Sequence, residues 1–112
     1  MKMIVAIIQP HRIDAVRDVL TEANVQGMTV SEVRGYGRQR GHKEVYRGAE
    51  YVVNLIPKVR LEIIVDKDEL EAALTAIVNA ANTGSIGDGK VWVTPIEEVI
   101  RVRTGERGIS AI

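Results

Sequence analysis

Residues 35–57, GYGRQRGHKEVYRGAEYVVNLIP, separate two halves of the chain that repeat the same order of expected elements. The stretch is rich in glycine and in basic side chains, and strand-like apolar patterns return on both sides of it. An irregular segment of about twenty residues is uncommon inside a small domain and usually has a function. We therefore expect residues 37–55 to form a protruding functional loop, although residues 51–56 are apolar enough to be strand instead.

The half before this stretch is predicted to be strand, helix and strand. Residues 3–8 are a continuous apolar run, typical of a central strand covered on both faces. Residues 12–23 carry apolar side chains at helical spacing, and Asn24 and Gly27 then supply a stop signal. Strand character returns over residues 28–35.

The half after it is predicted to repeat that order. Residues 59–65 alternate apolar and polar side chains, as a half-buried strand does. The sequence DKDE at 66–69 resembles a capping box, with Asp in place of Ser or Thr, before a helix over 70–81. Residues 91–93 form a short strand, and residues 99–103 are expected to be a further strand or an extended tail.

Two successive strand–helix–strand units predict an α+β fold, the ferredoxin-like double βαβ sandwich, as a single domain over residues 1–112. Right-handed crossovers place both helices on one face of the sheet. The strands over 3–8 and 59–65 also direct apolar residues to the other face. A bare apolar face is unusual on a monomer, so we expect self-association with closed cyclic symmetry.

Composition excludes several classes of protein. The chain has 112 residues, no cysteine and a formal net charge of zero. We therefore expect no disulfide framework, no thiolate metal site and no nucleic-acid or anionic-membrane partner held by a global field. The apolar run at the N-terminus is too short to span a bilayer and lacks a cleavage site. The expected location is the cytoplasm, without membrane insertion.

Residues 84–90, GSIGDGK, have the glycine and lysine spacing of a phosphate loop. Val91 stands where that motif needs Ser or Thr to hold magnesium, and the expected order is helix, loop, strand rather than strand, loop, helix. A P-loop NTPase is therefore disfavoured. Two alternatives stay open: an anion nest of glycine N–H groups beside Lys90, or a plain turn with a surface lysine.

Basic side chains accompany the other glycines. Arg38 follows Gly37 directly, and Arg101 and Arg103 share one face if their segment is extended. Three or four charge-assisted bonds of about 1.5–3 kcal/mol each could hold a polyphosphate. The alternative is that the C-terminal arginines pair with nearby carboxylates, at Glu97, Glu98 or Glu106.

Other polar residues suggest binding rather than catalysis. Lys58 lies at an expected loop–strand junction and could pair with a carboxylate, and Gln39 could ligate magnesium through its amide oxygen. His11 and His42 have no metal-ligand spacing. No nucleophile–base set can be assembled, so no catalytic residue is predicted and the chain is not expected to be an enzyme.

YRGAEY at 46–51 and TGSIGDGKVW at 83–92 closely resemble the two signatures of the PII nitrogen-regulatory signalling proteins. The resemblance covers the whole chain. It implies a homotrimer of ferredoxin-like subunits with a cleft between each pair of neighbours. Each cleft would bind ATP or ADP competitively and, with MgATP, 2-oxoglutarate.

The resemblance also assigns residues. It implies that these residues hold the nucleotide: Thr29, Gly35, Gly37, Arg38, Gln39, Glu62, Ile64, Gly87, Asp88, Gly89, Lys90, Arg101, Val102 and Arg103. Glu62 and Ile64 would lie near the adenine, while Thr29, Arg101 and Arg103 would come from the adjoining subunit. Residues 98–112 would be a C-terminal loop.

For 2-oxoglutarate, the resemblance implies a pocket formed by Gly37, Gln39, Gly41, Lys58 and Gly87. Gln39 would complete the magnesium shell, and Lys58 would pair with the distal carboxylate. The loop over 37–55 would be regulatory, with Tyr51 as the site of uridylylation or adenylylation. Residues 28–34 and Trp92 resemble the actinobacterial, adenylylated branch.

Implied partners are an ammonium channel, a nucleotidylyltransferase, or enzymes and regulators of nitrogen metabolism. Gln9 and His11 depart from the basic and aromatic residues of many members, and Ser85 from a frequent lysine, which makes 2-oxoglutarate binding less secure than nucleotide binding. Two other functions fit the same fold. One is a small phosphate-ester or acyl-phosphate hydrolase, and the other is an RNA-binding module, which would need stacking aromatics on the central strands.

Overall fold

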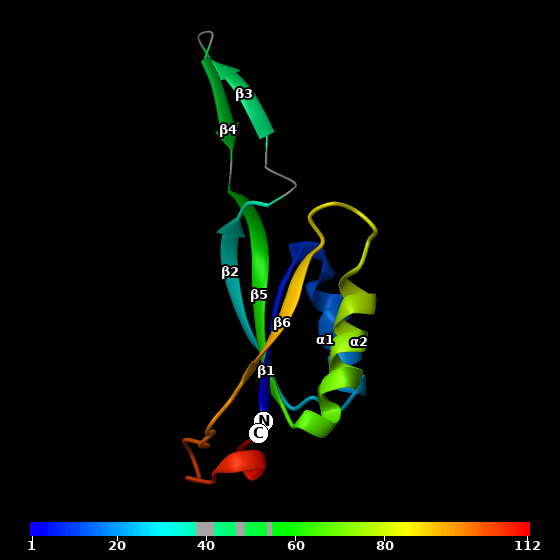
Figure 1. Ribbon diagram of the computed structural model, residues 1–112, viewed down its shortest axis with the longest axis vertical. Coiled ribbons are helices and arrows are strands. Elements are labelled where there is room, and N and C mark those ends of the chain that lie inside the picture. The colour runs from blue at the N-terminus through cyan, green and yellow to red at the C-terminus, as the bar shows by residue number, and fades with distance from the viewer. Residues whose placement is uncertain (38–41, 47–48, 54) are drawn as a thin grey trace.

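The computed structural model describes residues 1–37, 42–46, 49–53 and 55–112, with side chains for 1–37 and 55–112 (Figure 1). Its elements, in chain order, are β1 (Lys2–Ile8), η1 (Pro10–Arg12), α1 (Ile13–Glu22), β2 (Thr29–Gly35), β3 (His42–Tyr46), β4 (Ala49–Val53), β5 (Ile56–Val65), η2 (Lys67–Glu69), α2 (Leu70–Ala81), β6 (Gly89–Pro95) and η3 (Gly108–Ala111).

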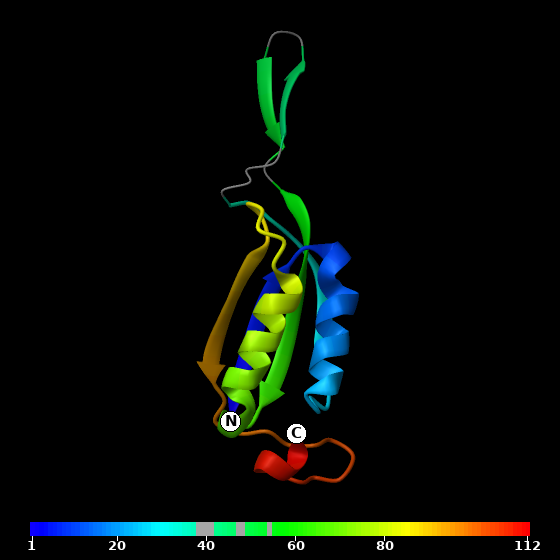
Figure 2. The same ribbon diagram turned by 90° about the vertical axis from the view of Figure 1, so that its right-hand side faces the viewer.

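The main sheet is antiparallel, with strand order β2-β5-β1-β6. Each helix connects two strands that have one strand of the other half between them, so β1 and β5 interleave at the centre. Both helices cover one face of the sheet (Figures 1 and 2). The predicted double βαβ sandwich of the ferredoxin-like class is confirmed.

The core lies between the helices and that face. Alternate residues of the central strands fill it from the sheet side: Ile4, Ala6, Ile8, Val59, Leu61, Ile63 and Val65. The helices contribute residues four apart, which share one helix face: Val16 and Leu20 from α1, and Ala73, Ile77 and Ala81 from α2. Each large aliphatic side chain buried in this way contributes about 1.5–3 kcal/mol.

Two local details of the helices differ from expectation. Val78, predicted on the apolar stripe of α2, is 49% exposed. The capping box is wrong, because Asp66 makes no side-chain cap; instead the Glu69 N–H donates to the backbone oxygen of Asp66 at 3.0 Å and forms a 3₁₀ turn. The predicted stop after α1 is confirmed at Asn24, whose φ of 61° is left-handed.

The stretch expected as an irregular loop contains a second, two-stranded sheet. β3 and β4 pair antiparallel, from His42 opposite Val53 to Tyr46 opposite Ala49. The hairpin extends beyond one end of the main sheet (Figure 1). The prediction that this stretch is irregular was therefore wrong. Its β-branched and aromatic residues favour strand pairing. The alternative of strand over 51–56 is confirmed in part.

The C-terminal segment is not a strand, contrary to the expectation for residues 99–103. The chain reverses after Arg101, because the Gly105 N–H donates to the Arg101 oxygen at 2.8 Å and Gly105 adopts a φ of 74°. Ile100 then bridges Arg107, and the short helix η3 follows. Of the helices in the described part of the chain, none has the length and apolarity needed to cross a membrane.

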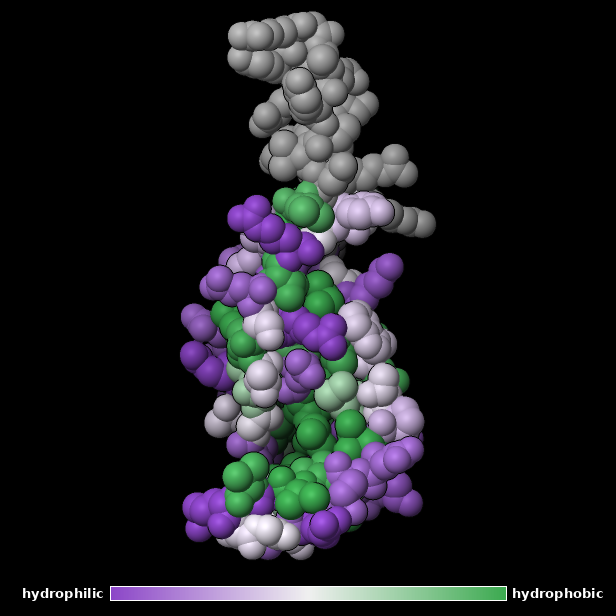
Figure 3. All heavy atoms as spheres, turned by 90° about the vertical axis from the view of Figure 1, so that its left-hand side faces the viewer, coloured by the Kyte–Doolittle hydropathy of each residue, from purple (hydrophilic) through white to green (hydrophobic). Residues whose placement is uncertain are grey.

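The sheet face opposite the helices carries both apolar and charged side chains (Figure 3). Cross-strand partners point to the same face, and two rows of partners define it. One row is Thr29, Glu62, Val5 and Trp92; the next is Ser31, Arg60, Ile7 and Lys90. No helix of the described chain covers this face, as predicted. The middle of this face is apolar at β1, where Val5 is only 1% exposed.

Candidate ligand cleft

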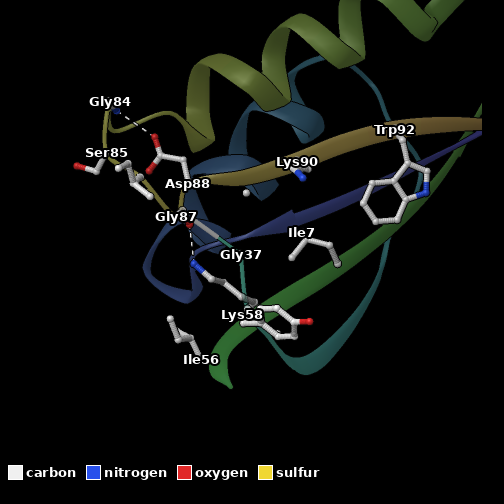
Figure 4. A pocket seen from close by; sticks show the side chains of 14 residues that line it. Ile7, Gly37, Ile56, Lys58, Gly84, Ser85, Gly87, Asp88, Lys90 and Trp92 are labelled. Atoms are coloured by element: carbon white, nitrogen blue, oxygen red, sulfur yellow. Dashed lines mark hydrogen bonds between the residues drawn. The ribbon is translucent and has the colours of Figure 1, made fainter. Parts of the chain in front are cut away.

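A cleft of about 570 Å³ lies at the end of the main sheet that is nearer the hairpin (Figure 4). Seven residues predicted to bind a ligand line it: Gly35, Gly37, Lys58, Gly87, Asp88, Gly89 and Lys90. They come from the end of β2, from β5, from the loop after α2 and from β6. Ligand pockets commonly measure 300–1,000 Å³, so the cleft has the size for a small ligand.

The loop over residues 84–89 is held by its own carboxylate. Asp88 Oδ2 accepts the N–H groups of Thr83 at 2.7 Å and Gly84 at 3.0 Å, and Asp88 Oδ1 accepts the Thr83 hydroxyl. These bonds, the Thr83 hydroxyl first, lower the pKa of the Asp88 carboxyl. The carboxylate stays ionised and is directed toward the start of its own loop (Figure 4).

Three glycines give the loop its path. Gly84, Gly87 and Gly89 have φ values of 81°, 100° and 105°, which side chains rarely allow. At Gly89 space is also absent, since a Cβ there would lie 1.7 Å from the backbone oxygen of Ile7. β6 thus begins in close backbone contact with β1, which fixes one side of the cleft.

Lys58 links β5 to this loop. Its side chain crosses the cleft, and Nζ donates to the Gly87 oxygen at 2.5 Å (Figure 4). Lys58 is only 9% exposed. Burial lowers the pKa of its ammonium group, and the negative charge of Asp88 partly opposes that shift. In sequence, Lys58 lies within β5, two residues after the strand begins at Ile56, rather than at the predicted loop–strand junction.

The residues expected near an adenine lie further along the same helix-free face. Thr29 and Glu62 are cross-strand partners, and Ile64 is on the same side of β5. Arg60 connects Glu62 to the cleft wall. Its Nε lies 3.6 Å from Glu62 Oε1, and its guanidinium carbon is 5.9 Å from the centre of the Trp92 ring.

The C-terminal arginines lie at the opposite end of the sheet from the cleft (Figure 1). Arg101 pairs with Glu106 at 3.1 Å, which confirms the alternative of an ion pair within the segment. Arg103 follows in an exposed turn beside Val102, which is 99% exposed. The condition under which both arginines would share one face, an extended segment, is not met, because the segment turns at residues 102–104.

A single chain thus brings together only part of the predicted site. Arg38, Gln39 and Gly41 lie outside the described residues, as does the side chain of Tyr51. Other residues that line the cleft were not assigned individually as binding residues: Ile7, Tyr36, Ile56, Gly84, Ser85, Ile86 and Trp92. Of these, Gly84, Ser85 and Ile86 belong to the stretch 84–90 that the sequence indicates as a candidate anion nest. A period-two pattern places Ile7 and Ile56 on one face of their strands, but it cannot say which face meets the loop.

The fold and the cleft define a class: a ferredoxin-like α+β domain with a positively charged, glycine-lined cleft at one end of its sheet. The family model "Nitrogen regulatory protein P-II" matches residues 1–106. Relatives with that name are 54% identical in Azospirillum brasilense and 55% identical in Mesorhizobium japonicum and Rhizobium meliloti. Each match spans all 112 residues and 100% of both chains.

The chain belongs to the P-II family of nitrogen regulatory proteins. The family resemblance of the two signatures is thereby confirmed. Membership of the adenylylated branch stays a prediction.

Proposed function

We propose that this protein is a cytoplasmic sensor of nitrogen, carbon and energy status, and that it binds ATP or ADP and, with MgATP, 2-oxoglutarate in the cleft. The observation that carries the proposal is the cleft itself. Gly84, Gly87 and Gly89, all with positive φ, line it, and Lys58 and Lys90 supply positive charge beside them. Anionic ligands match such a lining.

The ligand's charges are expected to act on the hairpin. Gly35 and Gly37 line the cleft, and Gly37 is the first residue of the arm formed by residues 37–55, so a ligand that contacts Gly37 also contacts the start of the arm. Gln39 would complete the magnesium shell. A coupling of about 1–3 kcal/mol is typical of such regulation, and it would change how the arm fits an ammonium channel or another partner protein.

A second copy of the chain is part of the proposal. The segment after β6 leaves the sheet at the end away from the hairpin (Figure 1), and Arg101 and Arg103 are not among the residues that line the cleft of their own chain. In a homotrimer, a neighbour would supply them together with Thr29. The exposed mixed face of the sheet gives the copies a surface on which to associate.

Calorimetric titration of 2-oxoglutarate with and without MgATP tests the shared site. We expect binding with MgATP and at least a tenfold loss without it, since magnesium would bridge the two ligands. Lys58→Met should weaken 2-oxoglutarate by a similar factor, whereas Lys67→Met, at an exposed lysine of η2, should not. Equal affinity for 2-oxoglutarate without nucleotide contradicts the shared-magnesium mechanism.

Covalent regulation is tested separately. A nucleotide attached to Tyr51 would alter the arm by bulk and charge. Tyr51→Phe should abolish modification by a nucleotidylyltransferase and leave ATP affinity unchanged, as measured by mass spectrometry and calorimetry. Modification of Tyr46 in that variant would show that the site is misassigned. Light scattering tests the assembly, and a stable monomer would leave the cleft without its second wall.

A further inference from the structure

We infer that Thr83 and Asp88 are a positioning pair for the glycine loop, and that Asp88 affects a bound anion only through the backbone it holds. This inference deepens the proposed function and rests on it for the ligand. It differs from the expectation that Asp88 cradles the nucleotide directly, and the variants below decide between the two. The pair fixes where the loop offers its amide groups before any ligand arrives.

The first argument is that the Asp88 carboxylate already accepts hydrogen bonds from its own loop. Three donors reach it: the Thr83 and Gly84 N–H groups on Oδ2, and the Thr83 hydroxyl on Oδ1. A further hydrogen bond closes the same turn, because the Gly84 N–H also donates to Asn82 Oδ1 at 2.7 Å. Charge-assisted bonds of this kind are stronger than neutral ones, so they hold the start of the loop against its end.

The second argument concerns charge. A carboxylate in direct contact with phosphates would repel them, because both are anions. Here the carboxylate is directed to Thr83 and Gly84, away from the side where Lys58 meets Gly87 (Figure 4). The negative charge is thus paired within the loop, although Asp88 also borders the cleft together with the cations Lys58 and Lys90.

The third argument is the position of Thr83. Thr83 is not among the residues that line the cleft. Its hydroxyl and its N–H both bind Asp88. A change at the Thr83 side chain therefore reaches a ligand only through the loop, which makes Thr83 a probe of positioning that is free of direct contact.

The test compares ATP affinity, measured by calorimetry, in the full chain and five variants. Asp88→Asn should weaken ATP about tenfold and Thr83→Val about threefold, while Thr83→Ser should restore wild-type affinity because it keeps the hydroxyl. The double variant should be no weaker than Asp88→Asn alone. If Asp88 acted on ATP only by repelling its phosphates, Asp88→Asn should instead bind ATP more tightly than the wild type does. Asp68→Asn, at an exposed site at the other end of α2, controls for net charge.

Amide hydrogen exchange on the ligand-free protein supplies a second readout. The Thr83 and Gly84 amides should exchange faster in Asp88→Asn, while the Ile77 amide in α2 should keep its rate. This readout separates two failures: if wild-type protein ignores ATP, the proposed function fails, yet the exchange result still tests the pair. Unchanged ATP affinity in Thr83→Val, or unchanged Thr83 and Gly84 exchange in Asp88→Asn, overturns the inference.

Discussion

The two ends of the sheet are built by different interactions. At the cleft end, the loop over 84–89 is fixed by hydrogen bonds to backbone groups, by Lys58 and by the close approach of Gly89 to Ile7. At the other end, backbone hydrogen bonds among Arg101, Gly105 and Glu106 turn the C-terminal segment, and the ion pairs there, Arg101–Glu106 and Arg107–Glu98, are exposed. Exposed pairs contribute little free energy. The side-chain ion pairs therefore add little at the C-terminal end, whereas a carboxylate, a buried lysine and a close backbone contact fix the loop at the cleft end.

The largest expected effect is at Gly89. Gly89→Ala should lower the free energy of unfolding by about 3 kcal/mol or more, because the new Cβ would meet the Ile7 oxygen and the φ is left-handed. Gly84→Ala is the matched control, since it shares the positive φ but has open space. It should cost only about 1–2 kcal/mol. Urea denaturation at one protein concentration measures both, and equal losses would contradict the packing argument.

Arg12 should give the next largest effect. Its Nε and Nη2 both donate to the Ala80 oxygen, at 2.9 and 2.5 Å, and tie the start of α1 to the end of α2 just before the loop. Arg12→Ala should lower the free energy of unfolding by about 1–2 kcal/mol. Arg17→Ala, at an exposed position of α1, should change it by less than about 0.5 kcal/mol. A similar loss in both variants would show that the Ala80 contact has no special role.

The pH dependence of Asp88 gives a smaller effect with a defined sign. The folded-state pKa of Asp88 lies below the usual 3.8, so the folded state binds its proton less readily than the unfolded state does. The stability that Asp88 contributes is full above pH 3.8 and is lost as pH falls toward the lowered pKa. The difference in unfolding free energy between wild type and Asp88→Asn should therefore narrow in acid. A constant difference across that window would contradict the assignment.

The smallest effect is expected at the C-terminal end. Glu106→Gln removes the Arg101 ion pair, in which both side chains are more than a third exposed. The free energy of unfolding should change by less than about 0.5 kcal/mol, and less still at high salt. A loss above 1 kcal/mol, measured by the same denaturation, would remove the contrast between the two ends.

The sequence predicts the main sheet and its helices well, and it predicts the C-terminal segment poorly. Periodicity located β1, α1, β5 and α2, because a single apolar face decides each of them. It failed at the C-terminal segment, where backbone bonds between Arg101, Gly105 and Glu106 reverse the chain and leave no apolar pattern. It also failed to predict the hairpin, since β3 and β4 pair with each other in a sheet separate from the main one.

The cleft shows a similar division. Glycine spacing and Lys90 located the loop that lines the cleft, because φ and charge are local properties of the chain. The bond between Lys58 and the Gly87 oxygen joins residues 29 positions apart, and no local pattern encodes it. Thr83 and Asp88 were within the recognised signature, yet only the geometry shows that they bind each other.

Trp92 is the chain's single tryptophan, and it borders the cleft at 40% exposure, beneath the Arg60 guanidinium. Indole emission responds to the polarity around the ring and to nearby charges. The protein therefore contains an intrinsic fluorophore at the proposed ligand site. A ligand bound in the cleft should change the emission wavelength and intensity of Trp92 in the unmodified chain.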